Sequence, residues 1–278
     1  MVSAKLWIVA TPLGNIEDLS PRARQILQDC DLIACEDTRR AGLLLQALGV
    51  RKVSLVSYHD SIELERAPEL IARMQAEQLT LALISDAGTP AIADPGFRLV
   101  RLAHESGISV SSVPGPSALS AIISVSGIPS DRVLFVGFLP RKKNQMVENI
   151  KVWKKTEASV VAFEAANRLS ASLETLAEEL PGTEICIGRE LTKTHEEIRL
   201  FSLNEAKAWA QTHRHLKGEV VLMIDTRAGD NEFDWKPILE KAEFLLKRGL
   251  SKSDVIKFLG TELRVKKELY RRLSKLDS

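Results

Sequence analysis

Short apolar runs alternate with amphipathic segments through the first half of the chain, and this order restricts the fold more than any other feature. The apolar runs lie at residues 6–10, 31–35, 52–58, 79–85 and 108–113. Runs this short and this continuously apolar are typical of strands that are buried on both faces. The β-α-β-α order therefore predicts an α/β fold whose mainly parallel sheet has helices on both faces.

The segments between these runs carry helix signals. We expect helices at residues 20–30, 38–49, 61–78, 95–107 and 116–127. Ser20 and Pro21 suit the N-cap and the first position of one helix, and Gly49 suits the end of the next. Pro68 lacks a backbone donor and lies inside the third helical pattern, so it predicts a break or a bend there.

The second half of the chain has a different pattern. Strand-like runs lie at residues 132–138, 159–164, 184–191, 196–203 and 218–225, with helical segments at 142–155, 168–180 and 203–215. Two of these strands are separated by only a few residues, which predicts a hairpin and hence a mixed sheet. We therefore expect an N-terminal domain at 1–127, a second α/β domain at 128–228 and a short helical C-terminal extension at 229–278.

The C-terminal extension has the only strong local charge. A polar segment at 226–234 precedes predicted helices at 235–249, 251–263 and 265–276. Residues 247–278 contain ten Lys or Arg against four Asp or Glu. Such an excess predicts binding to a polyanion. The alternative is a solvated helical tail whose positive face binds nothing.

The overall composition is that of an ordinary globular protein. Among 278 residues, 38 are basic and 37 acidic, so global charge does not indicate a partner. The three cysteines, Cys30, Cys35 and Cys186, form no C-x-x-C pair. This argues against a disulfide framework or a zinc site and predicts a cytoplasmic protein. The apolar run near the N-terminus is too short for a secretory signal or a membrane span.

Polar, glycine-rich or proline-rich loops follow five of the predicted strands. These loops lie at residues 10–15, 36–40, 57–60, 85–96 and 113–118. The carboxyl ends of parallel strands meet at one edge of a sheet, which is where such sheets bind ligands. Glycines expose the backbone and prolines stiffen it, which suits a nucleoside-like ligand. The phosphate-binding patterns G-x-x-x-x-G-K-[ST] and G-x-G-x-x-G are both missing from these loops.

Seven motifs follow one another in a fixed order between about residue 5 and residue 225. They read VATPLGNIEDLSPRA, EDTRR, SDAGTPAIADPG, VPGPSA, GFLPRK, FEAANRL and RELTKTHEE. In this order they resemble the tetrapyrrole methylase superfamily, and within it the branch that methylates small-subunit ribosomal RNA. The resemblance implies a two-domain enzyme that uses S-adenosylmethionine, forms a homodimer, and methylates the ribose 2′-oxygen of a cytidine in the decoding region of 16S rRNA.

The resemblance also implies which residues contact the methyl donor. Where tetrapyrrole-modifying relatives have Gly-Asp-Pro after the fourth strand, this chain has Gly88-Thr89-Pro90, which fits the RNA branch. In the second domain, the loop around Phe138–Leu139 and the last strand, Glu219–Met223, are expected to close the adenine side of the donor. The expected donor-binding residues are Pro12, Leu13, Ser85, Asp86, Ala87, Gly88, Thr89, Pro90, Ala91, Pro114, Ser117, Ala118, Leu139 and Val221.

Six residues are candidates for the chemistry at the ribose. Asp37, Glu36 and His59 could accept a proton, and Arg39 could bind a phosphate through both guanidinium nitrogens. Lys193 could stabilise a developing alkoxide or act as a base if desolvated, with Glu190 orienting it. The sequence selects no single base among them. Its spacings show no metal-ligand pattern, so a metal-free mechanism is expected.

We expect the EDTR, SYHD and RELTK motifs to face the RNA. Segments at 140–143 and 153–155 and the basic extension are expected to bind it as well. Two alternatives remain open: a C-methyltransferase that acts on a tetrapyrrole, and a ribosome-assembly factor that binds RNA without catalysis. The altered loops and the basic extension argue against the first, and the EDTR and RELTK motifs argue against the second.

Overall fold

The computed structural model describes residues 4–51, 53–213, 216–227, 235–262, 269–270 and 273. The chain divides into two compact units, residues 1–229 and 230–278. The larger unit holds two five-stranded sheets. The predicted boundary near residue 127 stays a prediction.

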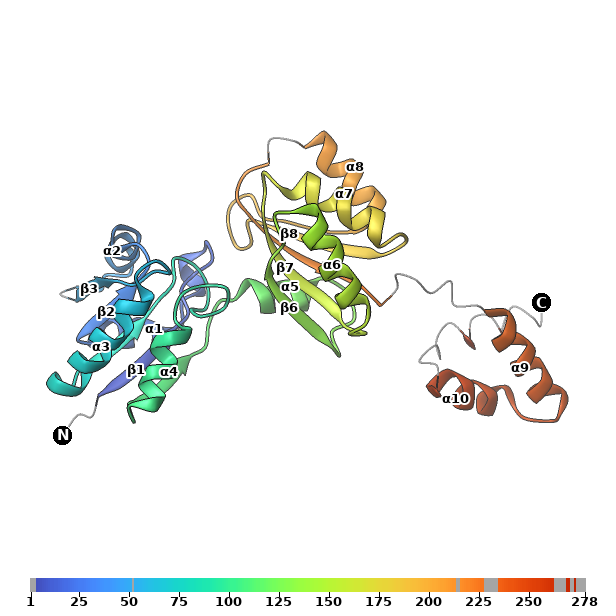
Figure 1. The fold of residues 1–278 in the computed structure, drawn as a ribbon, viewed down its shortest axis with the longest axis horizontal. Helices are drawn as coiled ribbons and strands as arrows, with labels where there is room; N and C mark the ends of the chain where they lie inside the picture. Colours follow the sequence, from blue (N-terminus) through green and yellow to red (C-terminus); the bar gives the residue numbers. More distant parts are fainter. Residues whose placement is uncertain are drawn as a thin grey trace. The chain divides into compact units, whose positions relative to one another are not determined.

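The first sheet is parallel throughout, as the β-α-β-α order predicted (Figure 1). Its strands are arranged in the order β3-β2-β4-β1-β5. Their bounds are β1 Lys5–Val9, β2 Leu32–Cys35, β3 Ser54–Ser57, β4 Thr80–Leu83 and β5 Ser109–Val113.

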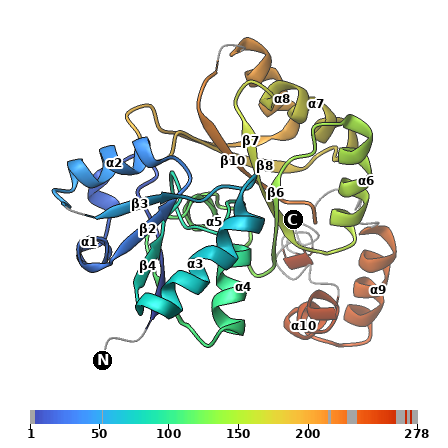
Figure 2. The same cartoon turned by 60° about the vertical axis from the view of Figure 1, so that its left-hand side comes forward.

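Helices cover both faces of this sheet, which confirms the prediction. The bounds are α1 Pro21–Asp29, α2 Thr38–Ala47, α3 Glu63–Glu77 and α4 Phe97–Glu105. On one face, Leu27 of α1 packs in a cluster with Ile33 of β2. On the other, Leu70 of α3 and Leu99 of α4 pack with Leu81 of β4. Figure 2 shows α3 and α4 beside each other. The two layers bury the sheet and leave its strand ends for the loops.

The helix boundaries follow the sequence signals with one correction. Ser20 Oγ accepts a hydrogen bond from the Ala23 amide at 3.1 Å, and Pro21 is the first helical residue. The expected break at Pro68 is wrong, because α3 runs through this residue. Pro68 lies in the second turn and deprives only the Leu64 carbonyl of its partner. The Leu64 side chain is 67% exposed, so water is close to that part of the helix.

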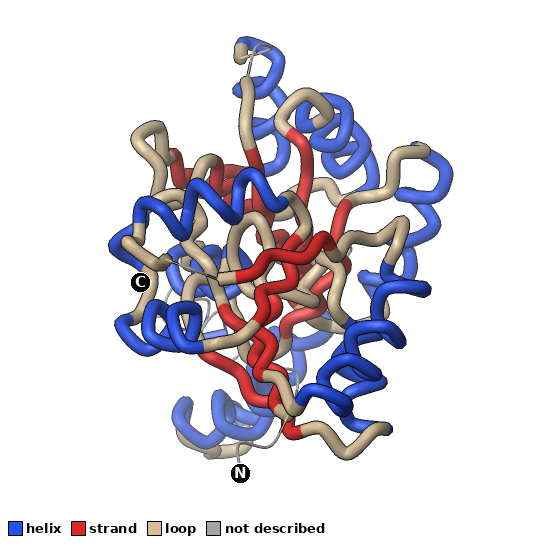
Figure 3. The backbone as a smooth tube through the Cα atoms, turned by 90° about the vertical axis from the view of Figure 1, so that its left-hand side faces the viewer, coloured by secondary structure: helices blue, strands red, loops and turns tan. Residues whose placement is uncertain are grey.

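The second sheet is mixed, also as predicted, and has the order β6-β7-β10-β8-β9. Its strands are β6 Val133–Phe138, β7 Ser159–Ala165, β8 Glu184–Arg189, β9 Glu197–Ser202 and β10 Glu219–Ile224. β6 and β7 are parallel, β10 runs antiparallel to β7 and β8, and β8 forms the predicted hairpin with β9. Figure 3 shows the strands of the chain in red with the helices in blue outside them.

Helices cover this sheet as well. One face carries α6 (Lys143–Lys154), α7 (Leu169–Glu179) and α8 (Leu203–Thr212) over a large apolar cluster. The other face packs against α5 (Ala118–Val125), whose Ile122 is fully buried against Val161 and Val221. Because α5 directly follows β5, it links the loop edge of the first sheet to the second sheet.

The smaller unit is helical. It contains α9 (Trp235–Lys247) and α10 (Lys252–Glu262) around a small apolar cluster that includes Ala242, Val255 and Leu259. Most of the predicted polar segment at 226–234 and of the third helix at 265–276 lies outside the described residues. Among the residues that are described, no helix is long and apolar enough to cross a membrane.

Candidate functional site

A cavity of about 260 Å³ lies within the larger unit, where the loops of the first sheet meet the second sheet. Its walls combine small apolar side chains, two aromatic rings, glycines and three carboxyl groups. The lining residues are Leu13, Ala87, Gly88, Thr89, Ile92, Asp94, Ser117, Ala118, Phe138, Phe163, Glu164, Ala165, Gly188, Leu191, Gly218, Glu219, Val220 and Val221.

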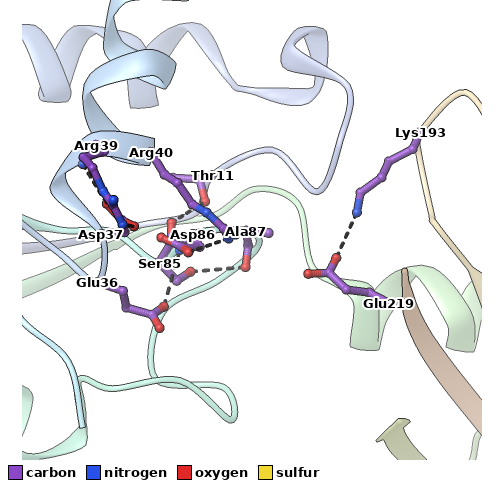
Figure 4. Close-up of polar contacts among 10 residues, drawn as sticks. All are labelled: Thr11, Glu36, Asp37, Arg39, Arg40, Ser85, Asp86, Ala87, Lys193 and Glu219. Atoms are coloured by element: carbon purple, nitrogen blue, oxygen red, sulfur yellow. Dashed lines mark hydrogen bonds and ion pairs between the residues drawn. The ribbon is translucent and has the colours of Figure 1, made fainter. Parts of the chain in front are cut away.

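The loops after β1 and β4 are joined to each other at this edge. The Thr11 amide donates to the Gly88 carbonyl at 2.8 Å, and the Gly88 amide donates back to the Thr11 carbonyl at 3.1 Å. The buried Thr11 hydroxyl donates to the Ser85 carbonyl at 3.0 Å, and Ser85 Oγ donates to the Ala87 carbonyl at 3.2 Å (Figure 4). These bonds hold the cavity wall rigid before any ligand binds.

Gly88 fits this wall only because it lacks a side chain. Its φ of +81° lies in the left-handed region that other residues rarely adopt, and a Cβ there would lie 3.2 Å from Cδ2 of Leu13. Thr89 follows and donates from Oγ1 to the Pro116 carbonyl at 3.0 Å. The loop after β4 is thereby tied to the loop after β5 as well.

The EDTR motif forms the start of α2. Asp37 is the N-cap, and its Oδ1 accepts the Arg39 amide at 2.8 Å while Oδ2 accepts Arg39 Nη2 at 2.8 Å (Figure 4). The hydrogen bonds from the Arg39 guanidinium and amide hold the pKa of Asp37 well below its usual range. The Arg39 side chain is 88% exposed. Asp37 is therefore a cap and a counter-ion, while Arg39 is presented to solvent.

Acidic side chains gather beside this motif. Arg40 Nη1 pairs with Asp86 at 2.8 Å, and Glu36 accepts the Asp86 amide at 3.4 Å. Burial, followed by the negative charge of Asp86, raises the pKa of Glu36. Burial also raises the pKa of Asp94 to about 7, with the Glu36 carboxylate as the next cause. The cavity wall thus contains a carboxyl group that changes charge near neutral pH.

Lys193 lies between two carboxylates. Its Nζ is 3.0 Å from Glu190 Oε1 and 3.1 Å from Glu219 Oε2. Figure 4 shows the pair with Glu219. Burial lowers the pKa of Lys193, but the two carboxylates outweigh it and hold the pKa above its usual value. Burial raises the pKa of Glu190, yet bonds from the Glu219 amide and Lys193 leave it below its usual value. Both groups are charged, which suits Lys193 to stabilising negative charge rather than to accepting a proton.

The loop that carries Lys193 is tightly constrained. Glu190 and Thr192 have φ values of +51° and +65°. A Cβ on Gly14 would lie 2.1 Å from Lys193 Cγ, and one on Gly218 would lie 2.2 Å from Glu190 Oε1. Thr192 Oγ1 also accepts the Asn15 amide at 3.0 Å. Strained backbone of this kind persists where the surroundings enforce it, often at functional sites.

Comparisons with known proteins place the chain in a family. Residues 5–207 match the model of the Tetrapyrrole (Corrin/Porphyrin) Methylases. A protein of Mesorhizobium japonicum is 41% identical over 98% of this chain and 92% of its own length, and one of Escherichia coli O157:H7 is 41% identical over 82% and 80%. Both are named ribosomal RNA small subunit methyltransferase I.

The chain belongs to the ribosomal RNA small subunit methyltransferase I family. It is therefore a methyltransferase. Solved structures with low sequence identity share the fold alone. Uroporphyrin-III-C-methyltransferase from Thermus thermophilus has a TM-score of 0.55 at 19% identity, covering 81% of this chain and 96% of its own. Diphthine synthase has a TM-score of 0.61 at 17% identity, covering 79% and 89%.

The structure brings half of the donor residues expected for this family to the cavity wall. These are Leu13, Ala87, Gly88, Thr89, Ser117, Ala118 and Val221. Residues in the same loops but outside the wall are Pro12, Ser85, Asp86, Pro90, Ala91 and Pro114. Of the expected loop around Phe138–Leu139, Phe138 lines the cavity, whereas Leu139 is buried in the core beneath α6 and α7.

The catalytic candidates of this methyltransferase are also spread over two places. Glu190 and Lys193 lie against Glu219, which lines the cavity. Asp37 and Arg39 lie at the start of α2, outside the wall, and His59 is also outside it, with Nδ1 2.9 Å from Ser61 Oγ. The described residues contain no cluster of His, Cys, Asp and Glu suited to a metal.

Sequence reasoning missed several wall residues and misplaced one aromatic. Ile92 and Asp94 belong to the loop after β4, at residues 85–96. Only the first half of this loop, up to Ala91, was expected to contact the donor. Phe163 carried no signal, because β7 was predicted only as a buried strand, and Gly218 lies one residue before the last strand, Glu219–Met223, that was expected to close the adenine side. Trp153 was expected to meet RNA; this is wrong, because its side chain is only 3% exposed in the core of the second sheet.

Proposed function

We propose that this protein transfers a methyl group from S-adenosylmethionine to the ribose 2′-hydroxyl of a cytidine in the decoding region of 16S rRNA, in the cytoplasm. The observation that supports it most is the cavity. Its walls are formed by the glycine-rich and proline-rich loops of the first domain and by the second sheet. Membership of the ribosomal RNA small subunit methyltransferase I family supports the substrate.

The cavity chemistry fits a sulfonium nucleoside. Leu13, Ala118 and Phe138 offer an apolar surface for a flat base, and the backbone groups of the stiff loops offer donors and acceptors for its polar edge. The carboxyl group of Glu219 matches a positive charge of such a ligand. When bound, the donor supplies an electrophilic methyl carbon. The rigid loops hold it in place and exclude water from it.

Two cations suit the RNA side. The Lys193 ammonium, held between Glu190 and Glu219, can stabilise the negative charge that develops on the ribose oxygen. The exposed Arg39 guanidinium can exchange its surface pair with Asp37 for a phosphate, which it binds through two parallel hydrogen bonds. The first cation thus acts at the reacting oxygen and the second positions the nucleotide.

A direct assay tests the proposal. Purified protein is incubated with methyl-labelled donor and, in parallel, with small ribosomal subunits, naked 16S rRNA and a uroporphyrinogen-type tetrapyrrole. We expect label in the RNA, and nucleoside mass spectrometry should identify 2′-O-methylcytidine. Label in the tetrapyrrole would favour the C-methyltransferase alternative. RNA binding without label in any substrate would favour the non-catalytic assembly factor.

The C-terminal unit is proposed to strengthen RNA binding. Deletion of residues 230–278 removes a separate compact unit and most of the local positive charge. We expect the affinity for small subunits to fall at least tenfold at physiological salt, and the dependence of affinity on salt to become shallower. Filter binding over a salt series measures both. Unchanged affinity and slope would show that the extension binds no RNA.

The homodimer is also a proposal. β9 lies at the edge of the second sheet and exposes Ile198 and Leu200, which are 38% and 50% accessible. Apolar side chains on an edge strand are typical of surfaces that pair with another chain. Sedimentation of the purified protein measures the oligomeric state.

A further inference from the structure

Three carboxyl groups line the cavity among the described residues, and two of them are already engaged. Glu164 is only 1% exposed, accepts hydrogen bonds from Ser172 and the Ala165 amide, and lies 3.3 Å from Arg168. Glu219 pairs with Lys193 at 3.1 Å. Asp94, the third, has no ion pair within the described part of the chain. It is the carboxyl group whose charge is least fixed by its neighbours.

The loop that carries Asp94 is held in an unusual conformation. Ala91 and Ala93 have φ values of +65° and +63°, a region that disfavours residues with a Cβ. Gly96 anchors the end of the loop, because its amide donates to Glu63 Oε1 at 3.0 Å and a Cβ there would lie 2.8 Å from Leu83 Cδ2. This strain is tolerated where the structure must place one side chain accurately. Here it fixes Asp94 in the cavity wall.

The charged groups around Asp94 come from its own loop and from two others. Glu36 follows β2, Asp60 follows β3 and Asp86 follows β4; each adds negative charge, while Arg40 pairs with Asp86 and offsets part of it. Burial is the largest cause that raises the pKa of Asp94 to about 7, Glu36 is the next, and hydrogen bonding with Ser85 opposes them. Asp94 is therefore ionised above neutral pH and protonated below it.

The other candidate bases are less suitable. The Arg39 guanidinium holds the pKa of Asp37 too low for Asp37 to retain a proton near neutral pH. Lys193 is kept protonated by its two carboxylate partners. His59 and Glu36 lie outside the cavity wall. Asp94 combines a place in the wall with a proton affinity matched to neutral pH.

We propose that Asp94 is the general base of the methyl transfer, an assignment that rests on the proposed function. Its carboxylate takes the proton of the ribose 2′-hydroxyl as the oxygen forms its bond to the methyl carbon. The carbon–sulfur bond breaks and its electron pair remains on sulfur, so the sulfonium becomes a neutral thioether. The carboxylate becomes a neutral carboxylic acid and later returns the proton to water, which balances charge and atoms.

The test compares the wild type with Asp94→Asn, a near-isosteric change that cannot accept the proton. The rate of single-turnover methylation of small subunits is measured for both proteins from pH 5.5 to 9. Calorimetry measures the affinity of each protein for the donor. We expect the wild-type rate to rise with pH and level off above about 7, and Asp94→Asn to be about 100-fold slower at pH 8 with a flat profile. Donor affinity should stay within threefold.

A second readout does not depend on activity. A carboxyl group whose pKa is higher in the folded than in the unfolded chain makes the free energy of unfolding fall as pH rises from about 4 to about 7. Denaturant unfolding should show this fall in the wild type and a smaller fall in Asp94→Asn. In a Glu36→Gln variant, the methylation rate should reach half of its maximum at a lower pH than in the wild type, because the substitution removes a negative charge near Asp94.

The exposed Asp29 of α1 provides the matched control. Asp29→Asn makes the same replacement of a carboxylate by an amide, but away from the cavity. It should leave rate, profile and donor affinity unchanged. The proposal is overturned if Asp94→Asn retains the wild-type rate and pH profile, or if it loses donor affinity in proportion to rate, which would make Asp94 a donor ligand. A wild type that methylates no RNA at any pH would instead refute the proposed function.

Discussion

Replacing Lys193 by methionine is expected to slow methylation of small subunits by about 10²- to 10³-fold at saturating donor. Methionine keeps the aliphatic stem that packs over Gly14 but removes the ammonium that Glu190 and Glu219 hold in place. Loss of that charge leaves the developing oxyanion unstabilised, whereas donor contacts are unaffected. Single-turnover kinetics measure the rate, and calorimetry should show donor affinity within threefold of wild type.

Lys207 offers a matched control for this substitution. Its side chain is 30% exposed, against 31% for Lys193, and it pairs with Glu174 at 3.6 Å on the helical face of the second sheet. Lys207→Met should therefore remove a comparable ion pair without changing the rate. Equal losses of rate and donor affinity in Lys193→Met would place Lys193 on the donor side of the cavity, contrary to our assignment.

Replacing Gly88 by valine is expected to weaken donor binding by about 10- to 100-fold. The added side chain enters the cavity 3.2 Å from Leu13 Cδ2 and forces a β-branched residue into a φ of +81°. Overpacking of this kind costs about 1–3 kcal/mol, which corresponds to that loss of affinity. Calorimetric titration with S-adenosylmethionine measures the effect.

Gly107 separates the effect of bulk in the cavity from that of backbone strain. Its φ is +71°, close to that of Gly88, but no atom lies within 4 Å of the position of its Cβ. Gly107→Val should lower thermal stability to a similar degree while donor affinity stays at the wild-type value. Equal affinities in Gly88→Val and the wild type would mean that the donor does not occupy this cavity.

Local patterns in the sequence predicted most of the fold. Continuous apolar runs separated by helical segments favoured a mainly parallel arrangement of the first five strands, and the short gap between β8 and β9 predicted a hairpin. The strand order β3-β2-β4-β1-β5 could not be predicted in this way, because it depends on pairing between segments far apart in the sequence. The predicted break at Pro68 was wrong for a different reason. A single lost hydrogen bond at an exposed turn does not end a packed helix.

The candidate site shows the same limit at the level of single residues. Phe138 lines the cavity and Leu139 lies in the core, opposite to the prediction for Leu139. The register between β6 and β7 shifts between Phe135 and Phe138, and Gly137 has a φ of +66°. Such an irregularity changes which side chains of a strand lie on a given face, and the resemblance that indicated this loop does not show it. Asp94 was missed because its raised pKa depends first on burial and then on the Glu36 carboxylate, and only the fold buries Asp94 and brings Glu36 near it.

One measurement tests the central claim most directly: a crystal structure of the protein soaked with S-adenosylmethionine. We predict density for the nucleoside in the cavity. It should contact Leu13 and Gly88 in the loops of the first sheet, Ala118 of α5 and Val221 of β10. Density for the nucleoside at any other place on the chain, with this cavity empty, would contradict the account.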